Sequence, residues 1–169
     1  EGAEALAGDG GIDGSQWKQL FQKLAASGKH FTTMCTNKET ACRLLEVIPA
    51  EIPVGFDHLA LGQGETNPEE SGFRELLRAA HERGNVYFKG PGYRTSLDPE
   101  KIAPMIVAII EKCGPGVVLL GATDAPHVWT VPNSGEPMRS HYPHETRVVD
   151  YLSSLTDLWA LSSRRRTAR

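Results

Sequence analysis

The chain has 169 residues, of which 40% are hydrophobic and 23% charged, as in an ordinary globular protein. This length predicts one domain with a sizeable core. The net charge of −3 gives no general attraction to nucleic-acid phosphates. The longest apolar runs, such as IAPMIVAII, are far shorter than the roughly 18 residues that a membrane span requires. We therefore expect neither nucleic-acid binding nor a membrane span.

Composition divides the chain into three segments. Residues 1–14 contain glycine, alanine and acidic residues without an apolar period, which predicts a flexible leader. Residues 15–161 are expected to form a single globular domain, and residues 162–169 a solvated basic tail. Because the first residue is Glu1 rather than methionine, we expect a processed protein or a module of a larger one, such as a secreted effector. The compartment stays open.

Apolar residues at helical spacing predict five helices along the globular segment. They are expected within residues 15–28, 36–48, 69–84, 97–114 and 145–161. The expected N-cap of the second helix is Thr36 or Asn37, and that of the fourth is Asp98, followed by proline at the first helical position. Gly84 is the expected C-terminal stop of the third helix.

Runs rich in β-branched and aromatic residues predict the strands. They are KHFTTMC, a run that starts at FDHLAL and passes into a glycine-rich loop, NVYFKG, GVVLL and HVWTV. The link between GVVLL and HVWTV is too short for a parallel crossover, so these two strands are expected to be antiparallel neighbours. This favours an α+β fold in which a helix-borne cysteine packs against an antiparallel sheet. A three-layer α/β sandwich is the alternative, because helices and strands alternate in the middle of the chain.

Cys35 is the first candidate for a reactive side chain. The three cysteines, Cys35, Cys42 and Cys113, show no CxxC spacing, which argues against a disulfide framework or a thiolate zinc site. Cys35 directly precedes an expected helix cap, where the helix dipole and free N–H groups favour the thiolate. We therefore expect a lowered pKa at Cys35.

A resemblance to a known superfamily links this thiol to His127. The segment LDPEKIAPMIVAIIEKCGPGVVLLGATDAPHVWTV predicts a helix, a Gly-Pro, an apolar strand, a short loop and a strand that begins at a histidine. This order resembles the C-terminal half of papain-like cysteine hydrolases, whose catalytic histidine begins such a strand. The cysteine also precedes the histidine, as in many members. The resemblance covers about a third of the chain.

The resemblance implies a thiol hydrolase that acts on peptide or amide bonds, as a protease, an amidase or a deamidase. Cys35 would be the nucleophile and His127 the general base and then the acid. His141 or Asn133 would orient the imidazole. The partner would be a protein or peptide substrate, and no cofactor is implied.

The remaining site predictions concern the cleft and metal binding. Thr32, Thr33 or backbone amides near the cysteine would hold the oxyanion, and Trp129 would form a wall of the cleft. SHYPHE contains two histidines and a glutamate, but its spacing matches no zinc motif, so no metal is expected.

Two other classes of function compete with the hydrolase. One is a non-catalytic interaction domain. The other is an α/β module that binds a nucleotide-type ligand through the loops LGQGETN and FKGPGYR, where Lys89 and Arg94 could contact an anion beside Tyr93. This alternative makes a structural prediction: the strands before the two loops are parallel neighbours, and both loops lie at one edge of the sheet.

Overall fold

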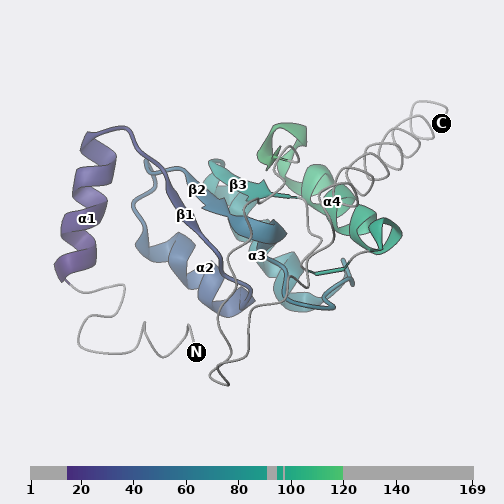
Figure 1. The fold of residues 1–169 in the computed structure, drawn as a ribbon. Helices are drawn as coiled ribbons and strands as arrows, with labels where there is room; N and C mark the ends of the chain where they lie inside the picture. Colours follow the sequence, from purple (N-terminus) through teal and green to yellow (C-terminus); the bar gives the residue numbers. More distant parts are fainter. Residues whose placement is uncertain (1–14, 91–94, 97, 120–169) are drawn as a thin grey trace, which may run out of the picture.

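The computed structural model describes residues 15–90, 95–96 and 98–119. In this part of the chain, helices and strands alternate around one parallel sheet (Figure 1). The elements are α1 (Ser15–Ala26), β1 (Phe31–Thr33), α2 (Lys38–Val47), β2 (Val54–Phe56), α3 (Ser71–Arg83), β3 (Val86–Lys89), α4 (Pro99–Cys113) and β4 (Val118–Leu119). Short 3-10 turns follow β2 and α4, at Asp57–Ala60 and Pro115–Val117.

The four strands lie in chain order, β1-β2-β3-β4, and every neighbouring pair is parallel. The antiparallel sheet expected from the sequence is therefore wrong. A helix separates each strand from the next, and this gives the chain the length that a parallel crossover requires. HVWTV, the expected antiparallel partner of GVVLL, lies outside the described residues, as do the domain boundaries expected at residues 14 and 162.

The four helices of the described residues form where the sequence predicts them, and the ends at Asn37, Asp98 and Gly84 are capped as expected. The fifth expected helix, within residues 145–161, lies outside the described residues. The Asn37 side chain accepts a hydrogen bond from the Thr40 backbone N–H at 2.8 Å, and Asp98 accepts one from the Glu100 N–H at 3.0 Å. Gly84 ends α3 with a φ of 79°, a left-handed conformation that favours glycine.

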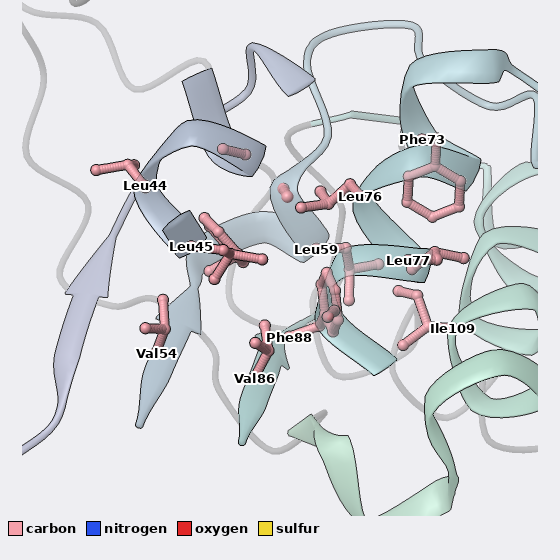
Figure 2. Close-up of a cluster of buried hydrophobic side chains, with 14 of the residues drawn as sticks. Leu44, Leu45, Val54, Leu59, Phe73, Leu76, Leu77, Val86, Phe88 and Ile109 are labelled. Carbon is pink, nitrogen blue, oxygen red and sulfur yellow. The ribbon is translucent and has the colours of Figure 1, made fainter. Parts of the chain in front are cut away.

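One continuous core joins α2, α3 and α4 to one face of the sheet (Figure 2). From the sheet it contains Val54, Phe56, Val86 and Phe88, all at most 1% exposed. The helices contribute Ala41, Leu44, Leu45, Phe73, Leu76, Leu77, Ala80, Ile102, Met105, Ile106 and Ile109, and Ile48 joins them directly after α2. Both inward positions of β2 and of β3 are filled by large apolar side chains, so this face of the sheet is fixed by hydrophobic burial.

The first helix extends the same layer beyond β1. Trp17 and Phe21 of α1 pack against Phe31, with ring centroids 6.2 Å and 5.9 Å from the Phe31 ring. Phe31 aligns with Val54 in the parallel register, so it lies on the helix-covered face. Figure 1 accordingly shows α1 at the β1 end of the sheet and α4 toward the other end.

A candidate ligand site at the carboxyl edge of the sheet

The loops that follow β2 and β3 leave the sheet from the same edge. The two strands are parallel neighbours, with Val54 opposite Val86 and Phe56 opposite Phe88. Parallel strands bring their carboxyl ends to one side of a sheet, and open α/β proteins bind ligands at that side, in a crevice where the strand order reverses. The four described strands lie in chain order, without such a reversal. The parallel pairing at a shared edge is the arrangement that the α/β ligand-binding alternative predicts for the strands before LGQGETN and FKGPGYR.

Hydrogen bonds join these two loops directly. The Gly64 backbone N–H donates to the Thr95 carbonyl oxygen at 3.0 Å, and the Thr95 hydroxyl donates to the Leu61 carbonyl at 3.4 Å. Thr95 is 4% exposed, so it acts as a buried link between the loops. The described parts of the two loops are therefore held together at the carboxyl edge.

An ion pair lies at the end of these strands on the face opposite the core. Asp57 directly follows β2, Lys89 ends β3, and the Lys89 Nζ lies 2.6 Å from the Asp57 Oδ1. Side chains alternate along a strand, so both point away from the face that carries Phe56 and Phe88. The side chains are 30% and 38% exposed for Asp57 and Lys89, so the pair is accessible.

Thr32, Gly55 and Tyr87 lie on the same face of the sheet as this ion pair. We call the surface formed by these three residues, Asp57 and Lys89 the opposite face. Thr32 aligns with Gly55, and Gly55 aligns with Tyr87. A Cβ placed on Gly55 would lie only 3.1 Å from the Thr32 Oγ1, which confirms that the Thr32 side chain lies over this glycine. Tyr87 is 36% exposed. The opposite face therefore presents a hydroxyl, a phenol and a charged pair around a residue that has no side chain.

A strained turn follows Asp57. His58, Leu59 and Ala60 have φ values of 51°, 60° and 58°, in the left-handed region that costs L-residues about 1–2 kcal/mol each. All three are buried. Such strain persists only where surrounding contacts enforce it, and it gathers at functional sites. It replaces the strand expected to begin at Phe56, which is in fact the last residue of β2.

The glycine amides of the first loop are occupied within the protein. The Gly62 N–H donates to the Glu65 carboxylate at 2.7 Å, and the Gly64 N–H to Thr95. Lys38, at the start of α2, reaches the same Glu65 oxygen at 2.5 Å. These two amides are therefore not free to bind a phosphate in this conformation.

The structure places Cys35 at the same carboxyl edge, two residues before the α2 N-cap Asn37. Its Sγ donates to the Asn37 carbonyl at 3.4 Å. Burial raises the pKa of the Cys35 thiol, and it outweighs the lowering by this hydrogen bond and by the Lys38 charge. The expected lowered pKa is therefore wrong. The Cys35 thiol is half-buried beside the start of α2, and the effect of burial on its pKa is larger than the opposing effects.

The other two thiols resemble Cys35. Burial raises the pKa of Cys42, with a further contribution from Glu75, and burial raises the pKa of Cys113. All three cysteines are unbridged. None of them stands out as an activated nucleophile.

Of the other residues predicted for the hydrolase site, the structure describes only Thr32 and Thr33. Thr33 is half-buried and aligns with Phe56, so it lies on the helix-covered face. His127, Trp129, Asn133 and His141 lie outside the described residues, and their roles stay predictions.

Lys89 was predicted from the sequence as a ligand-binding residue, whereas Asp57 and Tyr87 were not. The signal for Asp57 was available, since a polar residue just beyond the end of a buried strand is a candidate for the carboxyl edge. It went unused because the strand before Asp57 was expected to begin where it actually ends.

Comparison with known proteins returns no match to a family model, to a curated protein or to a solved structure. None of the helices in the described part of the chain is long and apolar enough to cross a membrane. Within residues 15–90, 95–96 and 98–119, histidine, cysteine, aspartate and glutamate side chains form no group of three that could hold a metal ion.

Proposed function

We propose that this protein binds a small molecule that carries an anionic phosphate or carboxylate group next to a hydroxyl group, as a nucleotide does. The observation that carries the proposal is the Asp57–Lys89 pair at the ends of two parallel strands, on the face opposite the core. The joined loops and the strained turn beside it support the same location.

The chemistry of the pair defines the ligand. An ammonium group has three donors, and Asp57 occupies one donor of Lys89, so an anionic oxygen can take another. The Asp57 carboxylate accepts hydrogen bonds and suits a ligand hydroxyl or N–H. Tyr87 offers a flat aromatic surface with a hydroxyl on the same face. Gly55 leaves the middle of this face without a side chain.

Calorimetric titration of the protein with adenosine monophosphate, ribose 5-phosphate, inorganic phosphate and lactate tests the proposal. We expect Lys89→Gln to weaken binding of the anionic ligands by about tenfold or more, because charge-assisted hydrogen bonds are the strong ones. Lys101→Gln is the matched control, since Lys101 lies on the outer helix α4 and is 62% exposed.

Asp57→Asn distinguishes the contact to the ligand's phosphate group from the contact to its hydroxyl group. Removal of the negative charge favours inorganic phosphate, whereas ribose 5-phosphate loses a charge-assisted bond to its hydroxyl group. If none of the four compounds binds, or if Lys89→Gln and Lys101→Gln bind equally well, the proposal is wrong. The four ligands also tell a phosphate preference from a carboxylate preference.

A thiol hydrolase is the second candidate function, and its support is the position of Cys35. This cysteine lies at the same carboxyl edge, beside the first turn of α2. In this proposal Cys35 attacks a peptide or amide carbonyl, His127 transfers the proton, and His141 or Asn133 orients the ring. Hydrolysis of a peptide library by the natural protein, lost in both Cys35→Ser and His127→Ala, would establish it. Unchanged hydrolysis in Cys35→Ser would remove it.

A further inference from the structure

A small pocket lies on the helix side of the carboxyl edge. It has a volume of about 150 Å³, and its floor contains Leu61, Phe73 and Met105, each at most 2% exposed. Its other lining residues are Lys38, Gly64, Glu65, Thr66, Asn67 and Glu70. A water molecule occupies about 30 Å³ in the liquid, so the pocket has room for a few waters or a short organic acid.

Lys38 is the buried charge of this pocket. Its side chain is 10% exposed, and its Nζ donates to the Thr36 carbonyl at 2.7 Å and to the Glu65 carboxylate at 2.5 Å. Burial of an ammonium group is costly unless an anion compensates for it. A carboxylate therefore stabilises Lys38 in this place.

Glu65 supplies that carboxylate from a side chain that is itself half-exposed. Its Oε2 accepts one hydrogen bond from Lys38 and one, of 2.7 Å, from the Gly62 backbone N–H. The same two donors can bind the carboxylate of a separate molecule. With 47% of its side chain exposed, Glu65 can move into solvent while its backbone stays in place. Glu70, the other acid in the lining, is committed to the first turn of α3 through Gly72 and Phe73.

We infer that this pocket is a binding site for a small aliphatic monocarboxylate, and that Glu65, which lines the pocket, competes with the ligand carboxylate for Lys38. The ligand carboxylate replaces that of Glu65 on Lys38 and on the Gly62 N–H, and its aliphatic part contacts Leu61, Phe73 and Met105. The site does not depend on the Asp57–Lys89 site, which lies on the other face of the sheet.

Titration of the full chain with sodium acetate and sodium propionate, against sodium chloride at equal ionic strength, tests the inference by NMR. We expect Glu65→Ala to bind propionate at least about tenfold more tightly than the natural protein, because a tethered competitor acts at millimolar or higher effective concentration. Propionate should bind about fourfold more tightly than acetate, since it buries one more methylene group.

Further variants show whether the binding depends on Glu65 and Lys38. Glu69→Ala removes an exposed acid of the same loop and should bind like the natural protein. Lys38→Met combined with Glu65→Ala should lose binding, and Lys89→Gln should not change it. Glu65→Gln serves if Glu65→Ala does not fold, because it keeps the shape of the side chain. Equal propionate affinity in the natural protein and in the Glu65 variant would overturn the inference, as would binding that survives the loss of Lys38.

Discussion

Arg83, the last residue of α3, donates a hydrogen bond of 2.8 Å to the carbonyl oxygen of Ile48, next to the end of α2. The same guanidinium donates to the carbonyls of Leu45, Pro49 and Ile52, and its Nε donates to Asn85. One side chain thus satisfies the backbone acceptors left at the end of a neighbouring helix and along the turn that leads into β2.

Replacement of Arg83 should therefore cost more than replacement of any exposed arginine. We expect Arg83→Ala to lower the free energy of unfolding by about 3 kcal/mol, because it leaves several partly buried carbonyls without a donor. Arg74→Ala, at a position 67% exposed, should change it by less than about 0.5 kcal/mol. Urea denaturation of both variants gives the comparison. Similar midpoints for the two would contradict the role assigned to Arg83.

Two buried alanines should respond differently to replacement by glycine. Ala41 and Ala60 are both fully buried, but Ala41 lies in α2 and Ala60 has a φ of 58°. Both variants lose one methyl group, whereas only Ala60→Gly relieves left-handed strain. We expect Ala60→Gly to be more stable than Ala41→Gly by about 1–2 kcal/mol in thermal or urea unfolding. The reverse order would mean that the turn after β2 is unstrained.

Acid should weaken the cap of α3. The backbone N–H groups of Gly72 and Phe73 donate to Glu70 and lower its pKa below the ordinary 4.5. The folded state therefore favours the ionised carboxylate. This stability is fully present above the unfolded-state pKa near 4.5, and it is lost as the pH falls through the lowered folded-state pKa.

Glu70→Gln should flatten that dependence. Unfolding midpoints are measured in buffers between pH 6 and pH 2, a range that brackets the usual glutamate pKa of about 4.3. As the pH falls, these midpoints should decrease less steeply in this variant than in the natural protein. Glu69→Gln, at an exposed neighbour, should keep the natural slope. A slope that is the same in all three proteins would show that the Glu70 cap does not titrate.

A side chain at Gly55 should narrow the opposite face. The new Cβ of Gly55→Ala would lie 3.1 Å from the Thr32 Oγ1, so one of the two must shift. We expect a loss of stability of about 1 kcal/mol and weaker binding of the proposed anionic ligand. Thr32→Ala in the same chain removes the close contact and should restore part of the stability. A double-mutant cycle with no coupling would contradict the contact.

Alkylation kinetics separate the two proposed functions. Because burial raises the pKa of Cys35, Cys42 and Cys113 alike, we expect iodoacetamide to modify all three slowly at pH 7. Mass spectrometry of timed digests measures each rate. Modification of Cys35 more than about tenfold faster than that of the other two would reverse our preference and favour the hydrolase.

Local sequence signals predicted the four described helices and the segments that form β1, β3 and β4, but they favoured the wrong strand direction. The caps at Asn37, Asp98 and Gly84 follow from residue type and a few neighbours, so they were predicted correctly. The parallel pairing of Val54 with Val86 depends on residues that are far apart in sequence, and no local pattern encodes it.

The candidate site was predicted in part for the same reason. Lys89 is recognisable in the sequence as a cation in a glycine-rich stretch. The pairing with Lys89, which makes Asp57 part of the candidate site, becomes apparent only in the structure. The left-handed turn at His58–Ala60 contains no glycine, so residue preferences point to a strand there. Packing against the core overrides those preferences.

The order of the strands has a consequence for how the chain reaches its native state. Among the four described strands, each pairs with its neighbour in sequence, so each of these pairings closes a loop of only one helix and its connections. Proteins with such short-range contacts lose less chain entropy before each contact forms, and they fold faster than proteins built from distant pairings. The sheet can therefore grow strand by strand from β1 as the polypeptide emerges during synthesis.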